Sequence, residues 1–219
     1  MRSNSTSYFY NFRRDVYDAL GIRLTDYSNI LELGCGDAIT LKHLKVTQNY
    51  IGIDSRHPLN GDSRIKKMDL NAGLDFKMGT FDLIIANDVL EHLQRPEKLL
   101  RDLKNYCTDQ SLFVISIPNF LYIDNLFDII KNLDFKYRKE GGILDETHLR
   151  FYTRKSIVRM LSQSGYVVRR IEPINGVFDK MSRLSRMKRI ALTFVFFARL
   201  KLVKEFGCLQ WALIVQKND

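Results

Sequence analysis

The stretch Ile30-Leu31-Glu32-Leu33-Gly34-Cys35-Gly36-Asp37-Ala38 is the strongest fold signal in this 219-residue chain. A mostly apolar run leads into Gly-x-Gly and then into the helix-like segment 39–44. This order predicts a buried strand, a tight turn and the start of a helix. Glycine permits positive φ in the turn and lets a ligand touch bare backbone. By itself the pattern fits a nucleoside-binding loop and an ordinary turn equally well.

A second predicted strand, 49–54, ends in a carboxylate. Asp54 lies twenty positions after Gly34. An acidic residue about 20 positions beyond a glycine loop, at a strand end, can accept hydrogen bonds from both ribose hydroxyls. Asp54 would otherwise be a turn former before Ser55. The spacing favours the nucleoside ligand.

Three further strands follow the same plan, over 64–70, 81–87 and 111–117. They alternate with helical segments, which predicts right-handed crossovers and an α/β fold with a doubly wound sheet. In such sheets the ligand lies at the carboxyl ends of the strands. The polar and glycine residues at the predicted ends are Gly34, Gly36, Asp54, Asp69, Asn87 and Asn119.

The remaining segments complete a single predicted domain over 1–219, with seven strands in a mostly parallel sheet. Residues 1–27 hold a helix over 8–20 that either packs on the sheet edge or forms a lid over the ligand. Residues 119–150 are an insertion with a helix over 121–133, expected on the substrate side. A helix is predicted from 96 to 106, and another with Thr153 as its N-cap and Gly165 as its C-terminal glycine. Strands over 166–171 and 208–215 complete the set, the last strand antiparallel.

The composition argues against a membrane-spanning, a secreted and a disulfide-rich protein. The hydrophobic share of 45% is ordinary for a globular protein. No apolar run approaches the roughly 18 residues of a membrane span, and the first residues lack a signal-peptide apolar region. Cys35, Cys107 and Cys208 are odd in number and far apart. We therefore expect reduced thiols in a cytoplasmic protein, without disulfides or a metal site.

The net charge of +9 lies almost wholly in the C-terminal third. Residues 1–150 hold 20 Lys+Arg and 21 Asp+Glu, whereas residues 151–219 hold 14 and 4. The excess centres on a basic amphipathic segment, 177–207. Its favoured interpretation is a helix packed on the core or on a dimer partner; oligomeric state stays open. The alternative is peripheral contact of 180–204 with the anionic inner membrane face. Nucleic-acid contact is disfavoured, because aromatic residues are not interleaved with the basic ones.

Together these segments resemble class I S-adenosylmethionine-dependent methyltransferases over about residues 28–172. The resemblance rests on 30–38, 51–54, 68–69, 81–93, which includes Asp88-Val89-Leu90-Glu91-His92, and 116–119. The segment 147–153, Thr-His-Leu-Arg-Phe-Tyr-Thr, is similar to a subgroup of small bacterial methyltransferases (type 23/11-like) linked to surface-polysaccharide and secondary-metabolite pathways.

The resemblance implies S-adenosyl-L-methionine as cofactor and S-adenosyl-L-homocysteine as product. The residues that it assigns to the cofactor are Glu32, Gly34, Cys35, Gly36, Asp54, Ser55, Asp69, Leu70, Asn87 and Leu90. Glu32 would help position the methionine amino group, which Asn87 and Leu90 adjoin. Asp54 would bind the ribose, and Asp69 the adenine amine. Ala38 departs from the glycine of many relatives; this weighs against a dinucleotide site, which most needs that glycine.

The resemblance also implies methyl transfer to a small-molecule acceptor, for which we expect O-methylation of a sugar, a lipid-linked glycan or a secondary-metabolite intermediate. A hydroxyl acceptor needs a base, and histidine is the natural candidate. His148, where the insertion returns to the sheet, is favoured over His92, which follows the fourth strand. Asp145 and Glu146 would either orient His148 or be ordinary loop carboxylates, and the second interpretation is favoured. The alternatives are an RNA methyltransferase and a non-catalytic cofactor-binding partner protein.

Overall fold

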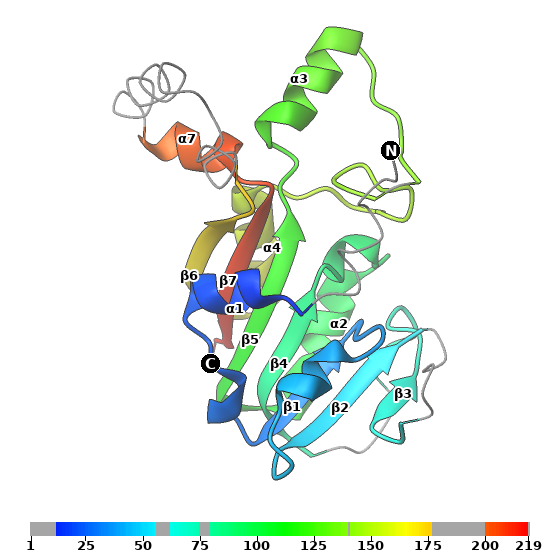
Figure 1. Ribbon diagram of the computed structural model, residues 1–219, viewed down its shortest axis with the longest axis vertical. Coiled ribbons are helices and arrows are strands. Elements are labelled where there is room, and N and C mark those ends of the chain that lie inside the picture. Colours follow the sequence, from blue (N-terminus) through cyan, green and yellow to red (C-terminus); the bar gives the residue numbers. More distant parts are fainter. Residues whose placement is uncertain (1–11, 56–61, 75–78, 140, 177–199, 219) are drawn as a thin grey trace.

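The computed structural model describes residues 12–55, 62–74, 79–139, 141–176 and 200–218, and seven strands in this part form one sheet. The strands are β1 (Asn29–Leu33), β2 (Asn49–Asp54), β3 (Ile65–Lys67), β4 (Phe81–Asn87), β5 (Cys107–Pro118), β6 (Tyr166–Ile174) and β7 (Gln210–Lys217). Their order across the sheet is β3-β2-β1-β4-β5-β7-β6 (Figure 1). The pairs among β1 to β5 are parallel, whereas β7 runs antiparallel to both strands that it pairs with, β5 and β6. The predicted mostly parallel sheet with an antiparallel last strand is confirmed.

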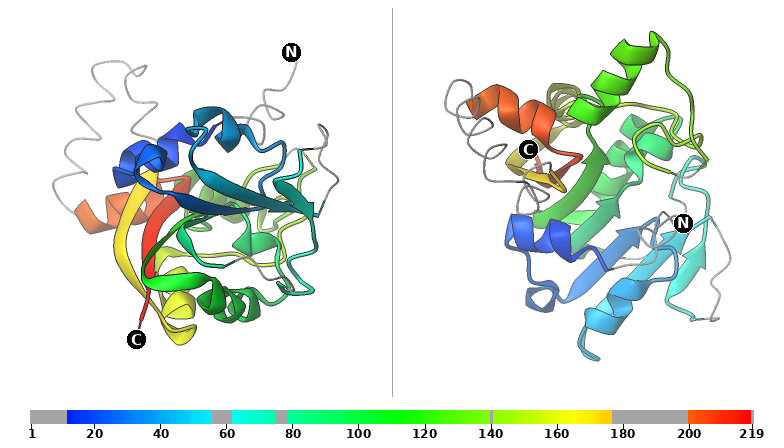
Figure 2. Two further views of the ribbon diagram at one scale, coloured as in Figure 1. Left: turned by 90° about the horizontal axis from the view of Figure 1, so that it is seen from below. Right: turned by 45° about the horizontal axis from the view of Figure 1, so that its top comes forward.

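Helices lie on both faces of the sheet. The α-helices are α1 (Arg14–Leu20), α2 (Pro96–Leu103), α3 (Ile123–Asn132), α4 (Arg154–Gln163) and α7 (Leu200–Gly207). The short 3-10 helices are η2 (Leu24–Asp26), η3 (Ile39–His43), η4 (Leu90–His92) and η5 (Lys104–Tyr106). Seen from below, α1 covers one face and α2 and α4 cover the other (Figure 2). No helix in the described ranges has the length and apolar character that crossing a bilayer requires.

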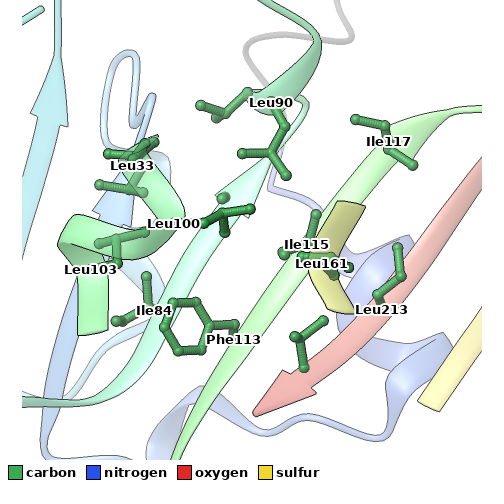
Figure 3. Close-up of a cluster of buried hydrophobic side chains, with 14 of the residues drawn as sticks. Leu33, Ile84, Leu90, Leu100, Leu103, Phe113, Ile115, Ile117, Leu161 and Leu213 are labelled. Atoms are coloured by element: carbon green, nitrogen blue, oxygen red, sulfur yellow. The ribbon is translucent and has the colours of Figure 1, made fainter. Parts of the chain in front are cut away.

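Side chains of the central strands alternate between two cores, as strand geometry requires. In β4, Leu83 and Ile85 pack in the core under α1, whereas Ile84 and Ala86 pack in the core under α2 and α4. Figure 3 shows the second core, where Leu100 of α2 packs near β4 and β5. Burial on both faces explains why 81–87 reads as a continuous apolar run.

The helix α4 begins as its sequence predicts. The Thr153 hydroxyl accepts a hydrogen bond from the Ser156 backbone amide at 3.2 Å, and Ser156 Oγ accepts one from the Thr153 amide at 2.8 Å. This reciprocal cap satisfies two amides that a helix start leaves open. Gly165 follows the helix with φ +79°, a left-handed conformation that favours glycine.

Three elements are shorter than predicted. The helix over 39–44 is only the single 3-10 turn η3, because the chain becomes extended at Leu44 and enters β2 five residues later. The strand over 64–70 is cut to β3, an edge strand that pairs only with β2. The helix over 96–106 ends as η5. Of the basic segment, residues 177–199 lie outside the described residues.

Candidate active site

A pocket opens at the carboxyl ends of β1 and β4. Its lining residues are Phe12, Arg13, Glu32, Leu33, Gly34, Cys35, Asp37, Ile39, Thr40, Asn87 and Asp88. Four residues predicted for the cofactor, Glu32, Gly34, Cys35 and Asn87, thus surround one cavity. The sequence allowed a lid in this part of the chain but did not single out Phe12 or Arg13, which reach the pocket from the segment before α1.

The glycine turn is held by backbone geometry. Gly34 has φ +62°, and a Cβ there would lie 2.8 Å from Cγ2 of Val89. Gly36 has φ +52°, and its amide donates to Asp54 Oδ2 at 2.8 Å. The turn is therefore fastened to the end of β2. Ala38 also adopts a left-handed φ of +50°, a conformation that L-residues other than glycine rarely take.

Glu32 presents a buried carboxyl group to the pocket. Thr40 Oγ1 donates to its Oε1 at 2.9 Å, and the Tyr50 hydroxyl donates to its Oε2. Burial outweighs these hydrogen bonds and raises the pKa of Glu32 to about 7. A carboxylate held this way gains from a cationic group in the pocket, because such a group replaces the water that burial removed.

Asn87 and Leu90 differ in what they offer a ligand. Both side-chain polar atoms of Asn87 are buried without a hydrogen-bond partner among the described residues, and the residue lines the pocket. Buried amide groups are normally satisfied, so a ligand is the natural partner. Leu90 is 1% exposed and lies within the core of Figure 3 rather than on the pocket wall.

The residues predicted for the ribose and adenine lie beside the pocket, at and just beyond the ends of β2 and β3. Asp54 is buried, and Ser55 next to it is exposed. Asp69 is exposed and accepts the Asn71 amide at 2.9 Å. Leu70 is half-buried and packs on the core. Their assignment to the adenosine remains a prediction.

Arg13 closes a polar network on the other side of the pocket. Its guanidinium pairs with Asp88 and donates to Ser116 Oγ at 3.2 Å and Gln210 Oε1 at 3.0 Å. Gln210 in turn donates to Asp88 Oδ1 at 2.7 Å. Burial alone would raise the pKa of Asp15, but Arg13 lowers it below the usual value. These partners come from β4, β5, β7 and α1, so no local sequence pattern could reveal them.

Both predicted bases meet in one cluster after β4. The rings of His92 and His148 lie 4.7 Å apart, centroid to centroid. Glu91 joins them, and one ligating atom from each residue lies within 4.8 Å of the others. Burial and the neighbouring His148 lower the pKa of His92. Burial and the Asp88 charge raise the pKa of Glu91 well above its usual value. Glu91 was missed as a site residue, although it directly precedes His92.

The chain holds two further histidines, His43 and His57, and the carboxylate Asp145 lies close to His148 in sequence. His43 stacks on Phe12, with ring centroids 3.7 Å apart. His57 lies outside the described residues. Asp145 accepts the Thr147 amide at 2.8 Å and the Thr147 hydroxyl at 2.5 Å. The Asp145 carboxylate therefore holds Thr147, while the Asp145 backbone carbonyl accepts the His148 amide at 3.0 Å.

The sheet order, the antiparallel β7 and the pocket at the glycine turn define a Rossmann-like methyltransferase fold. Residues 8–171 match the family described as methyltransferase domain, and the chain belongs to that family. The protein is an S-adenosylmethionine-dependent methyltransferase. No curated protein matches the chain. The positive-φ glycine turn, the buried Glu32 and the unsatisfied Asn87 amide fit the cofactor that this family uses.

Solved structures share the fold at low sequence identity. A SAM-dependent methyltransferase from Archaeoglobus fulgidus is 18% identical, with a TM-score of 0.61 over 92% of this chain and 91% of that one. The Burkholderia thailandensis 1,6-didemethyltoxoflavin-N1-methyltransferase, with its acceptor and S-adenosylhomocysteine bound, is 12% identical (TM-score 0.53; 93% and 75% covered). The plantazolicin methyltransferase BpumL, with a monoazolic desmethylPZN analog and SAH, is 16% identical (TM-score 0.55; 98% and 83%).

Proposed function

We propose that this protein methylates a hydroxyl of a small-molecule acceptor, a sugar, a lipid-linked glycan or a secondary-metabolite intermediate. S-adenosyl-L-methionine supplies an electrophilic methyl group when bound, and S-adenosyl-L-homocysteine is the product. The proposal is carried by one observation: two buried or half-buried imidazoles, His92 and His148, lie just beyond the β4 end that lines the pocket. The protein itself positions the cofactor and the acceptor and takes up the proton that the acceptor hydroxyl loses.

On the cofactor side, Glu32 would receive the methionine ammonium, and Asn87 would bond the same part of the molecule. Gly34 would let the cofactor approach the backbone, because its lack of a side chain leaves the turn open. Asp54 would accept the ribose hydroxyls, with Ser55, Asp69 and Leu70 around the adenine.

On the acceptor side, either imidazole could remove the hydroxyl proton. Nδ1 of His148 lies 2.9 Å from the Ile143 carbonyl oxygen, which can only accept. Nδ1 therefore carries the hydrogen and Nε2 carries the lone pair. Burial lowers the pKa of His92, which favours its neutral, proton-accepting form near pH 7.

The insertion supports an acceptor with an apolar part. α3 stands beyond the carboxyl ends of the parallel strands (Figure 1). It exposes Ile123, Phe127 and Ile130, with exposed fractions of 45%, 62% and 70%. Phe135 and Tyr137 follow, with ring centroids 5.9 Å apart. Small acceptors are bound in the toxoflavin and plantazolicin enzymes above. An RNA acceptor is disfavoured, because residues 1–150 carry no net positive charge.

The test is to incubate the protein with methyl-labelled S-adenosyl-L-methionine and separated polar, lipid and RNA fractions of a cell extract. We expect a methyl ether in a sugar or lipid fraction, identified by mass spectrometry. Label in RNA or on nitrogen would contradict the acceptor assignment. The matched control is Gly34→Val, whose side chain would meet Val89 and fill the turn. Titration calorimetry with the cofactor separates the alternatives: binding without turnover in every fraction would favour the non-catalytic partner protein.

A further inference from the structure

The cluster of Glu91, His92 and His148 has the composition of a metal site, and we propose that it binds one divalent first-row transition-metal ion such as Zn²⁺. One ligating atom from each side chain lies within 4.8 Å of the others. Ligand atoms around a tetrahedral Zn²⁺ lie roughly 3.3 Å apart, so small side-chain rotations would complete the site. The absence of paired cysteines, which led us to expect no metal, has no bearing on a histidine and carboxylate site.

The hydrogen bonds around both imidazoles leave Nε2 as the ligating atom. Asp145 accepts from the Thr147 hydroxyl at 2.5 Å, so that hydroxyl has no hydrogen left for His92. His92 Nδ1, 3.0 Å from this oxygen and 3.2 Å from the Thr147 carbonyl oxygen, must therefore donate. His148 Nδ1 donates to the Ile143 carbonyl in the same way. Backbone carbonyl and carboxylate partners of this kind typically orient the histidines of metal sites.

Glu91 supplies the independent sign of a missing partner. Its side chain is 1% exposed, and neither carboxylate oxygen has a hydrogen-bond partner among the described residues. Burying a carboxylate without a partner is costly, and a bound cation would remove that cost. The Glu91 backbone is already engaged, because its carbonyl accepts the amides of Leu149 and Arg150. The return of the insertion is thus fastened to Glu91, which keeps His148 beside it.

The neighbouring carboxylates are occupied elsewhere. Asp88 is held by Arg13 and Gln210, and Asp145 by Thr147. Within the described part of the chain, the site therefore offers three protein ligands, two nitrogens and one carboxylate. Two imidazoles favour Zn²⁺, Co²⁺ or Ni²⁺ over Mg²⁺ or Ca²⁺, which prefer oxygen ligands. Three ligands leave a coordination position open, as in catalytic rather than structural zinc sites.

A catalytic role for the ion, through its open coordination position, would extend the proposed function and rests on it. An acceptor hydroxyl bound there would lose its proton to bulk water more readily, because a divalent ion stabilises the oxyanion. The ion would then do the work otherwise given to a histidine base. Metal binding itself does not depend on methyl transfer, so the two can fail separately.

The test uses the full chain, freed of metal by a chelator and titrated with Zn²⁺ and Co²⁺. We expect one ion per chain, a higher midpoint of thermal unfolding, and Co²⁺ d–d bands without a thiolate charge-transfer band. Glu91→Gln, His92→Ala and His148→Ala should each weaken binding at least about tenfold, and Thr147→Val by roughly tenfold to a hundredfold. The matched control is His43→Ala, which removes a histidine that stacks on Phe12 outside the cluster and should leave binding unchanged.

Two results would overturn the site: no stoichiometric uptake by the folded protein, or uptake that persists in the cluster variants. If a buried variant such as Glu91→Gln fails to fold, as judged by circular dichroism, the variants at half-buried His92 and exposed Thr147, His92→Ala and Thr147→Val, decide the question. Methyl transfer is measured in parallel, before and after chelation. Metal binding with unchanged transfer after chelation would retain the site and reject its catalytic role. Absence of any transfer would count against the proposed function alone.

Discussion

The guanidinium of Arg13 forms an ion pair with the carboxylate of Asp88, 75 positions further along the chain. Both side chains are largely buried, with exposed fractions of 12% and 11%. The pair fixes the segment before α1 against the carboxyl end of β4. The helix α1 packs on the sheet, and Phe12 and Arg13 before it line the pocket. A lid formed by residues 1–27 stays a prediction.

Arg13→Ala should destabilise the protein. Removing one partner of a buried ion pair leaves an uncompensated charge, which costs about 3 to 5 kcal/mol. Here the loss leaves two carboxylates, Asp15 and Asp88, without their shared cation. We expect urea denaturation to show a lower midpoint, and the double variant Arg13→Ala, Asp88→Asn to recover part of the loss.

The control for this prediction is Arg23→Ala. Arg23 pairs with Asp26 on the surface at 3.1 Å, with exposed fractions of 81% and 51%. Such exposed pairs contribute about 1 kcal/mol or less. Equal losses in the two variants would show that the Arg13 network adds no more than a surface contact.

Gly34→Ala should weaken cofactor binding, whereas Gly79→Ala should not. The two glycines have similar φ values of +62° and +72°, so alanine is strained by about 1 to 2 kcal/mol in either place. Only at Gly34 would the new Cβ also meet a neighbour, Val89 Cγ2 at 2.8 Å; at Gly79 no atom of the residues that the structure describes lies within 4 Å. We expect weaker cofactor binding by calorimetry in Gly34→Ala alone. Intact binding there would mean that the turn does not face the cofactor.

The sheet could be predicted because its signals are local. The strand 81–87 reads as buried on both faces, and the structure gives it the same bounds as β4. Thr153 was predicted as a helix cap from its neighbours alone, and its cap is confirmed. The helix predicted over 39–44 was wrong in length. Nothing within 39–44 distinguishes a single 3-10 turn from a longer helix, because the length depends on how soon the following chain enters β2.

The site could be predicted only where its residues follow a strand end. Gly34 and Asn87 were found that way. Arg13 was not, because its meaning comes from Asp88, Ser116 and Gln210, which lie far apart in sequence. The meeting of His92 with His148 likewise depends on how the insertion folds back, which no spacing in the chain encodes.

Asp54→Ala should abolish most cofactor affinity. The carboxylate would accept both ribose hydroxyls, and each hydrogen bond to a charged group contributes about 1.5 to 3 kcal/mol. It also accepts the Gly36 amide at 2.8 Å, so its loss would loosen the glycine turn. We expect a fall of at least about a hundredfold by calorimetry. Asp109→Ala, at a residue 70% exposed near the start of β5, is the control. Unchanged binding in Asp54→Ala would refute the ribose assignment.

The basic segment 180–204, most of which lies outside the described residues, should carry any membrane affinity. We expect the protein to sediment with anionic vesicles and not with neutral ones, and to be released by high salt, which screens surface charges. Replacing Arg183 and Arg186 by Glu should reduce recovery, whereas Lys66→Glu with Lys67→Glu, on the exposed edge strand β3, should not. Equal recovery with both vesicle types would remove the membrane contact.

Glu32 should make the cofactor-free protein less stable as pH rises from about 4.5 to 7. Burial raises the pKa of this carboxyl from 4.5 to about 7, so in that range the folded state holds a proton that the unfolded state has lost. The free energy of unfolding then falls by roughly 3 kcal/mol and levels off above pH 7. Glu32→Gln cannot ionise, so its stability relative to the unaltered protein should increase between pH 4.5 and pH 8. Urea denaturation of both proteins measures this difference, in which the titration of all other groups cancels. A constant difference across the range would show that burial does not raise the pKa of Glu32 in the folded state.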